Sequence, residues 1–389
     1  MLPEIIHFTE EDIQKRVSHA QQLMQEHGLN GMVILAQANL IYYSGFRSVT
    51  MWNSVTRPTF LFMPAKGKPI FYTQIFRRAD AEILCLACDV EYFSEIFQPP
   101  VSQIKDIMHR LNMDRGDIGW EFGLEHRVGC TQNLLMEIKA ALPEANFVDC
   151  CDIIWKQRLR KDAKEIQCIK AACAATDYAF AHLAPQIKPG MTELDAWRIC
   201  QIEMLRGGAE YVVCHNVTSS PENYHRGSKI ADNDLILPGN MLWFDLTAYF
   251  CGYHSDYCRG FIMGEISDER RRLWDMVVAV TQETSEALKP DALCSDVARA
   301  CSTALAKRGI DSNFEVGRLG HGSGLQATEP PSIMIGDDTV LEPGMVIHIE
   351  PGIVNELGNF VCEEMYVITE NDRERLSNAS RELISIPCD

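Results

Sequence analysis

The chain has 389 residues, of which 46% are hydrophobic and 23% are charged. This composition is typical of a soluble globular protein, and the length is sufficient for two domains that each bury a core. The formal net charge of −18 and the lack of Lys and Arg runs argue against nucleic acid as a partner, because clustered cations bind a phosphate backbone.

The first half of the chain mixes helix and strand signals. Residues 9–28 start with a Thr that can cap a helix, continue through an acidic first turn with apolar residues at helical spacing, and stop at a Gly. They predict a helix. Residues 31–37, 58–64 and 67–73 are short, apolar and bounded by turn residues, and they therefore predict strands.

A charged stretch before a long expected helix at about 162–184 marks a domain boundary. We place an amino-terminal domain at residues 1–157 and a second domain at residues 158–389. The second domain begins with helices, becomes rich in short strands after residue 210, and contains a further helical block at about 267–308. Helices and strands segregated in this way predict an α+β fold.

Cysteine usage and the chain's first residues bear on the compartment. The 15 cysteines have no regular spacing, and many lie in apolar or helical stretches, which predicts buried thiols in a reducing cytoplasm. The amino-terminal stretch is acidic and lacks the basic and apolar regions of an export signal. No apolar run of about 20 residues could span a bilayer. We expect a cytoplasmic protein without a membrane partner.

Two acidic residues, Asp245 and Asp256, lie in the stretch FDLTAYFCGYHSD. This stretch predicts two strands joined by a Gly-Tyr turn, with an aspartate near the end of each strand. Like charges in a partly dehydrated pocket repel, so either one carboxylate takes up a proton or both share a cation.

Three further stretches place an acid or a His in an apolar or Gly-rich setting. They contain His321 in GRLGHGSGL, Glu350 in VIHIEPG, and the neighbours Glu363 and Glu364 in FVCEEMYVIT. Each stretch alone is more often a turn or a strand end. Together they are hard to explain as surface, since carboxylates are seldom buried unless paired or metal-bound. One imidazole with several carboxylates suits Mn, Fe, Co or Zn, and predicts a dinuclear centre.

The order and spacing of these motifs resemble those of the pita-bread metallopeptidases, which include methionine aminopeptidase, aminopeptidase P and prolidase, and of their relative creatinase. The stretch ILAQANLIYYSGF is similar to the amino-terminal domain of prolidases and creatinase, and LRKDAKEIQCIKAA is similar to their interdomain helix. The resemblance covers nearly the whole chain. It implies a pita-bread catalytic domain preceded by a smaller α/β domain, and a homodimer.

The resemblance also implies a ligand set for two divalent ions, with Mn expected first and Fe, Co or Zn as alternatives. The implied ligands are Asp245 as a terminal carboxylate, Asp256 and Glu363 as bridging carboxylates, His321 as the single imidazole, and Glu350 as a further carboxylate. Glu363 is preferred to Glu364 because the family's ligand stands six residues before the Thr that closes this strand, here Thr369.

Three residues have implied catalytic roles. Glu350 would move a proton from the attacking water to the leaving nitrogen. His225, in SSPENYHRGS, stands roughly where the peptidases keep a His that contacts the substrate, with an exposed loop His as the alternative. Thr328, in GLQATEPPS, replaces the family His that helps hold the substrate carbonyl. A hydroxyl can donate a hydrogen bond but cannot become a cation near pH 7.

Several side chains flank the implied ligands. Arg259, three residues after Asp256, matches a family Arg and is interpreted as a partner of a ligand or as a structural ion pair. His254 and His348 could each orient a ligating carboxylate, although packing is the preferred interpretation for His348.

The resemblance implies a dinuclear metallohydrolase of the Xaa-Pro peptidase and creatinase type. It would cleave a C–N bond in a short peptide or a small zwitterionic substrate. The stretches GRLGHGSGLQATEPPS and DDTVLEPGMV are more similar to the small-molecule branch, so an ectoine hydrolase or dimethylsulfoniopropionate lyase type is the alternative. A non-catalytic binding scaffold is the third hypothesis, but scaffolds typically lose several of these carboxylates, whereas all five positions are filled here.

Overall fold

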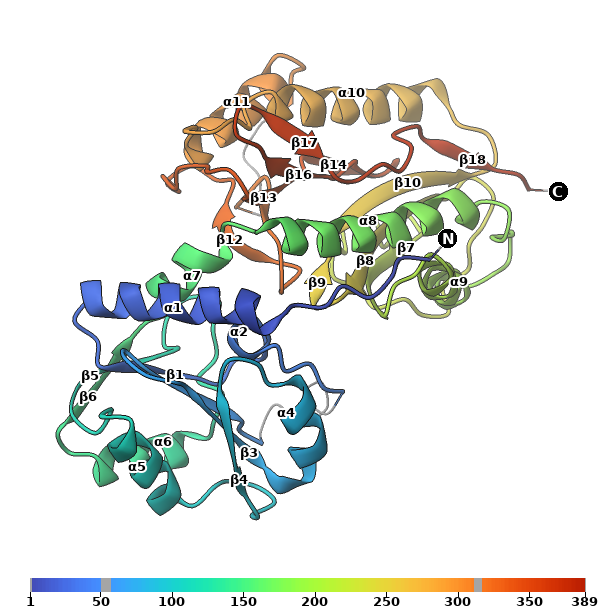
Figure 1. Cartoon of the computed structure of the whole chain (residues 1–389). Coiled ribbons are helices and arrows are strands. Elements are labelled where there is room, and N and C mark those ends of the chain that lie inside the picture. Colours follow the sequence, from blue (N-terminus) through green and yellow to red (C-terminus); the bar gives the residue numbers. More distant parts are fainter. Residues whose placement is uncertain (1, 50–56, 311–316, 389) are drawn as a thin grey trace. The chain divides into compact units, whose positions relative to one another are not determined.

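A computed structural model describes residues 2–49, 57–310 and 317–388 (Figure 1). It divides into two compact units. One unit is His7–Arg158, and the other runs from Leu159 to the carboxyl end and includes the segment before His7. Each unit is described by itself.

The amino-terminal unit is built on a mixed six-stranded sheet. In pairing order its strands are β4 (Asp89–Phe93), β3 (Ile70–Gln74), β2 (Phe60–Pro64), β1 (Gly31–Ile34), β5 (Gly116–Trp120) and β6 (Ala145–Asp149). Its helices are α1 (Glu10–Glu26), α2 (Gln37–Ser44), the 3-10 turn η1 (Ile75–Arg77), α4 (Arg78–Leu84), α5 (Val101–Arg110), α6 (Gln132–Ala141) and α7 (Cys151–Arg158). The strands β1 and β2 are buried along their whole length, and α5 and α6 pack onto them in one apolar core.

The first helix begins where the sequence predicts. The Thr9 hydroxyl accepts a hydrogen bond from the Asp12 N–H at 3.3 Å, and the Asp12 carboxylate accepts one from the Thr9 N–H at 2.7 Å. This capping box satisfies two amide groups that the helix leaves without partners. The expected helix and the three expected strands of the first 75 residues are confirmed as α1, β1, β2 and β3.

A buried carboxylate lies within this unit. Glu121 follows β5, is fully buried, and accepts hydrogen bonds from the N–H groups of Leu35 at 2.7 Å and Ala36 at 2.8 Å and from the amide of Asn39. Burial raises the pKa of Glu121 to about 7, although these hydrogen bonds favour the charged form and lower it.

The raised pKa of Glu121 predicts a pH-dependent stability. The folded state binds this proton more tightly than the unfolded chain, so the free energy of unfolding should fall as the pH rises from about 4.5 to about 7. The contribution is roughly 3 kcal/mol. The free energy of unfolding, measured with denaturant at pH 5 and at pH 7.5, should differ less between the two pH values in the Glu121→Gln variant than in wild type. Glu82→Gln, at an exposed ion pair, is the control. An equal pH dependence of the free energy of unfolding in wild type and Glu121→Gln would contradict the prediction.

The second unit contains two main sheets and a small hairpin. The first sheet pairs β18 (Ile384–Ile386), β10 (Tyr257–Met263), β8 (Met241–Phe250) and β7 (Tyr211–Thr218), with β9 (Tyr253–His254) on β8. The second sheet pairs β12 (Glu329–Ser332), β11 (His321–Gly322), β13 (Val346–Ile349), β16 (Glu364–Ile368) and β17 (Arg373–Arg375). The hairpin is β14 (Gly352–Asn355) with β15 (Gly358–Val361).

Helices of the second unit pack against these sheets. They are α8 (Ala163–Leu183), α9 (Glu193–Arg206), α10 (Asp268–Ser285) and α11 (Cys294–Ala306). The long helix expected at about 162–184 is confirmed as α8, and the expected helical block divides into α10 and α11. In the structure, α8 contacts β8 and β9, α9 contacts β7, and α10 contacts β13 and the hairpin. Helices and strands are thus segregated along the chain, which is the expected α+β arrangement.

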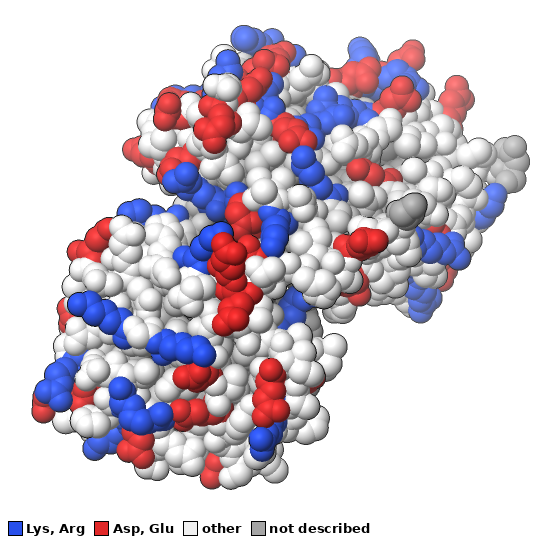
Figure 2. All heavy atoms as spheres, viewed as in Figure 1, with Lys and Arg blue, Asp and Glu red and all other residues white. Residues whose placement is uncertain are grey.

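Acidic and basic side chains are interspersed over the face shown in Figure 2. The cysteines whose side chains the structure describes are not in disulfides, and most of them are buried. Buried thiols behave as small apolar groups. None of the helices in the described parts of the chain has the length and apolarity that crossing a membrane requires.

Candidate metal centre

Strands β8 and β10 bring the two aspartates together. Asp245 lies in the middle of β8, directly opposite Cys258, and Asp256 immediately precedes β10. The chain reverses at Cys251 and Gly252, whose φ angles are 52° and 100°. The expectation that Asp245 stands near a strand end before a Gly-Tyr turn is therefore wrong. As a central strand paired on both sides, β8 continues past Asp245 before the chain turns.

Negative charge is crowded at this point. Oxygens of Asp245, Asp256 and Glu363 lie within 4.8 Å of one another. Thr247 Oγ1 donates a hydrogen bond to Asp256 Oδ1 at 2.8 Å. Burial, and then the charge of Asp245, raise the pKa of Asp256 well above its usual range. The pKa of Glu363 is raised by burial and then by neighbouring carboxylates. A cation would relieve both effects.

The second sheet supplies an imidazole. His321 is buried, and its Nδ1 lies 2.8 Å from the Gly322 carbonyl oxygen. A proton on Nδ1 satisfies this contact and leaves the Nε2 lone pair directed at the carboxylates. Nε2 is 3.7 Å from Glu350 Oε1 and 3.9 Å from Glu363 Oε1, beyond hydrogen-bond length. An imidazole nitrogen grouped with carboxylate oxygens is donor chemistry that suits Mn, Fe, Co and Zn.

Glu350 follows β13 at the more accessible side of the group. Its side chain is 29% exposed, and its N–H donates to the Leu319 carbonyl oxygen at 3.0 Å. Burial raises the pKa of Glu350 to about 7, the charge of Arg318 opposes this shift, and the charge of Asp245 adds to it. A carboxyl group with such a pKa can take up and return a proton near neutral pH.

The neighbours Glu363 and Glu364 have different surroundings. Glu364 is fully buried, and its Oε1 lies 3.0 Å from Arg259 Nη2 and 2.7 Å from Arg381 Nε. Glu363 instead shares the group with Asp245 and Asp256. The structure therefore places Glu363, and not Glu364, beside the other carboxylates.

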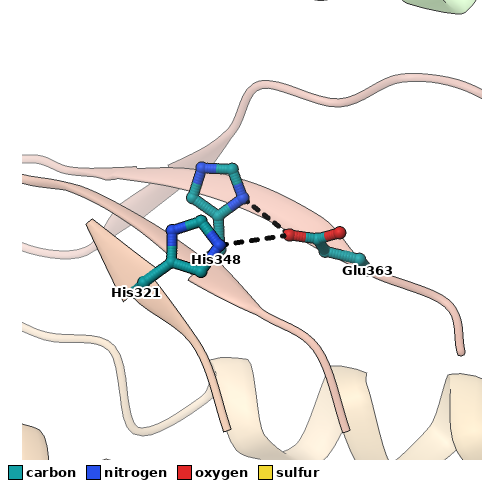
Figure 3. A group of neighbouring side chains, drawn as sticks. All are labelled: His321, His348 and Glu363. Atoms are coloured by element: carbon teal, nitrogen blue, oxygen red, sulfur yellow. Dashed lines mark hydrogen bonds and ion pairs between the residues drawn. The ribbon is translucent and has the colours of Figure 1, made fainter. Parts of the chain in front are cut away.

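His348 contacts a carboxylate of the group, so the packing interpretation preferred from the sequence is not sufficient. Its ring stacks on His321 with a centroid distance of 4.3 Å, and its Nδ1 lies 2.8 Å from Glu363 Oε1 (Figure 3). Burial, and then the charge of His321, lower the pKa of His348 well below its usual value. The neutral ring can donate from Nδ1 and orient Glu363. The available signal was the spacing of two residues between His348 and Glu350, which strand alternation places on one face.

Arg259 holds the backbone next to the same carboxylate. Its Nη1 donates to the Glu363 carbonyl oxygen at 2.7 Å, while its Nη2 pairs with Glu364. It therefore serves both as a structural ion pair and as a support for Glu363, so the two interpretations made from the sequence apply together.

Two of the implied catalytic residues lie in loops. His225 is exposed between β7 and β8, and Thr328 is half-buried just before β12. Neither side chain forms a hydrogen bond or ion pair with the part of the chain that the structure describes. Sequence reasoning missed Arg318, which is half-buried and close enough for its charge to lower the pKa of Glu350. Its position in GRLGHG, three residues before His321, was the only signal.

Comparison with known families gives this geometry a context. Residues 167–370, more than half of the chain, match metallopeptidase family M24, and residues 16–160 match the creatinase/prolidase N-terminal domain. The chain belongs to metallopeptidase family M24. It is therefore an enzyme of the hydrolase class.

Relatives of this M24 enzyme are named as peptidases. An uncharacterized peptidase of Bacillus subtilis is 25% identical over 95% of this chain and 99% of its own length. A Xaa-Pro dipeptidase of Pyrococcus horikoshii is 30% identical over 63% of this chain and 70% of its own length. These relatives do not confirm the resemblance to the small-molecule branch.

Solved structures share the fold of this M24 enzyme. A prolidase from Thermococcus sibiricus superposes with a TM-score of 0.85 at 22% identity, covering 96% of this chain and 99% of the other. The Pyrococcus horikoshii prolidase gives a TM-score of 0.82 at 24% identity, covering 95% and 100%. The expected pita-bread domain preceded by a creatinase-like amino-terminal domain is confirmed.

Proposed function

We propose that this M24 enzyme uses two divalent ions to hydrolyse the C–N bond of Xaa-Pro dipeptides or closely similar short peptides. The observation that carries the proposal is the group formed by Asp245, Asp256 and Glu363, whose oxygens lie within 4.8 Å of one another and of which Asp256 and Glu363 are buried. Such crowding is costly unless cations neutralise it. The Xaa-Pro dipeptidase name of a 30% identical relative supports the substrate class.

The donor set fits the proposed ions. The ligands would be Asp245, Asp256, His321, Glu350 and Glu363, and Mn is the first candidate, with Fe, Co or Zn as alternatives. When bound, divalent ions polarise a carbonyl group and lower the pKa of water. His348 and Arg259 would hold Glu363 through its side chain and its backbone.

Side chains of the protein would transfer the proton and bind the substrate. Glu350 takes a proton from water and returns it to the leaving nitrogen. The Thr328 hydroxyl donates a hydrogen bond to the scissile carbonyl, in place of the His found in the peptidases. His225 contacts the substrate from the loop between β7 and β8. These three roles are inferred from the family motifs and from where the residues lie in the chain.

We also infer that the enzyme works as a cytoplasmic homodimer on small substrates, rather than on nucleic acid or at a membrane. The free thiols of the described cysteines support the compartment. The net charge of −18 disfavours a polyanionic partner. The dimer is inferred from the resemblance to prolidases and creatinase.

A second candidate is a small-molecule hydrolase or lyase of the ectoine hydrolase or dimethylsulfoniopropionate lyase type. One observation favours it, which is Thr328 in the position of the peptidase His. A hydroxyl provides weaker electrophilic help than an imidazolium, and a peptide amide needs such help.

Metal analysis followed by a substrate panel tests the proposal. Protein purified without chelator should contain close to two divalent ions per chain by elemental analysis. It should hydrolyse Xaa-Pro dipeptides, lose this activity after chelation, and regain it with Mn. Ectoine-like and sulfonium compounds serve as the contrast. Near-stoichiometric metal with no dipeptide turnover would exclude the peptidase proposal and favour the second candidate.

A further inference from the structure

Strand register places three polar side chains on the same sheet face as Asp245. Asn216 of β7 lies directly opposite Asp245, and Thr218 lies directly opposite Trp243 of β8. In an antiparallel pair, opposite residues project to the same face, and so do residues two apart along one strand. Asn216, Thr218 and Trp243 therefore project to the side of the sheet that carries the candidate metal centre.

These three side chains are buried with polar atoms that have no nitrogen or oxygen partner in the described structure. Asn216 is 1% exposed, Thr218 is 0% exposed and Trp243 is 7% exposed. The atoms concerned are Asn216 Oδ1, Thr218 Oγ1 and Trp243 Nε1. The Trp243 N–H lies near the thiol of Cys258 and acts to lower the pKa of that thiol, so within the described structure Trp243 has at most this weak sulfur acceptor. Buried polar groups normally have partners, so three such atoms on one face require an explanation.

Asn216 shows which of its amide atoms is available. Its Nδ2 donates to the Arg226 carbonyl oxygen at 2.9 Å, so the hydrogen-bond network assigns the unused Oδ1 as an acceptor. Arg226 is the residue after His225. Asn216 therefore lies between the loop that carries His225 and the strand position of Asp245.

We propose that Asn216, Thr218 and Trp243 form a subsite that binds an uncharged hydrogen-bonding group of the substrate beside the scissile bond. This inference rests on the proposed function and defines its substrate class. The subsite offers an acceptor on Asn216, a donor on Trp243, and a hydroxyl on Thr218 that does either. A carboxamide or a hydroxyl group matches this set. A substrate carboxylate would be repelled by the oxygens of Asn216 and Asp245. An ammonium group, which only donates hydrogen bonds, could not pair with the Trp243 N–H.

The preferred dipeptides are therefore those with Asn, Gln, Ser or Thr before the proline. Pairs of substrates with nearly equal shape isolate the hydrogen bond, namely Thr-Pro against Val-Pro and Asn-Pro against Leu-Pro. With the Mn-loaded enzyme, kcat/KM should favour the polar member of each pair by at least about tenfold, because unpaired site groups penalise the apolar member. In Thr218→Val and Asn216→Leu, kcat/KM should fall more for the polar member, and the ratio should approach one.

A measurement without substrate separates binding from folding. In the metal-free protein, Thr218→Val removes a hydroxyl without a partner, so the melting temperature should stay equal or rise. The matched control is Thr176→Val, because Thr176 is also fully buried but its hydroxyl is 2.7 Å from Ser255 Oγ. This control should melt at a lower temperature than wild type.

The outcomes are distinguishable. Dipeptide turnover without preference for the polar member would overturn the subsite and leave the proposed function intact. A loss of melting temperature in Thr218→Val as large as in Thr176→Val would also overturn it, since the hydroxyl would then serve the fold. Failure to hydrolyse any dipeptide would overturn the proposed function, and the subsite with it.

Discussion

Replacing Asp256 by Asn should abolish the binding of two divalent ions and lower kcat for dipeptide hydrolysis by more than about 100-fold, which exceeds the range typical of residues that only orient ligands. The carboxamide keeps the shape of the side chain but removes the charge that a shared cation requires. In the metal-free protein the same change removes a buried carboxylate from a mutually repelling group. The metal-free variant should therefore melt at a higher temperature than metal-free wild type, and added Mn should stabilise it less.

Two control variants separate this prediction from a general loss of structure. Thr247→Val keeps the Asp256 carboxylate but removes the 2.8 Å hydrogen bond to it, so the loss in kcat should stay within about 10–100-fold. Glu342→Gln alters an exposed carboxylate of the same unit, which pairs with Arg160, and should leave metal content and activity unchanged. Retention of two ions per chain by Asp256→Asn, with kcat close to wild type, would exclude Asp256 as a ligand.

Local patterns predicted the elements that position the centre. The capped helix over residues 9–28 and the helix at about 162–184 follow from end signals and spacing that act within one or two turns, so the sequence could place both. The preference for Glu363 over Glu364 came from the family's spacing. The structure gives these neighbours different partners, because Glu364 is surrounded by arginines.

Contacts between strands that are distant in the sequence could not be predicted from local sequence patterns. The hydrogen bond from His348 to Glu363 depends on the register between β13 and the chain entering β16, which no sequence signal fixes. The charge of Arg318 near Glu350 depends in the same way on the pairing of Leu319 with Glu350. The error at Asp245 has a similar cause. The length of β8 is set by its pairing with β7 and β10, whereas the sequence suggested only where a turn could occur.

Replacing Arg259 by Met should lower the free energy of unfolding by about 3 kcal/mol, the low end for breaking a buried ion pair. Arg259 and Glu364 are both almost completely buried, and the change leaves the Glu364 carboxylate with Arg381, the more distant Arg375 and the Ser377 hydroxyl. Denaturant unfolding measures this loss. Lys170→Met, at a pair whose side chains are 44% and 50% exposed, is the control and should cost at most about 1 kcal/mol.

The double variant Arg259→Met with Glu364→Met separates the two functions of Arg259. It removes both buried charges, so part of the lost stability should return, because apolar side chains can replace a buried ion pair without loss. The carbonyl oxygens of Ser380 and Ala379 still lose the hydrogen bonds from Arg259, so the recovery should be incomplete. It does not restore the 2.7 Å hydrogen bond to the Glu363 carbonyl oxygen, so metal affinity should remain about 10–100-fold below wild type in a chelator competition. Recovery of metal affinity together with stability would mean that the backbone of Glu363 needs no support from Arg259. Recovery of stability alone would assign to Arg259 a positioning role toward the metal centre that is separable from its ion pair.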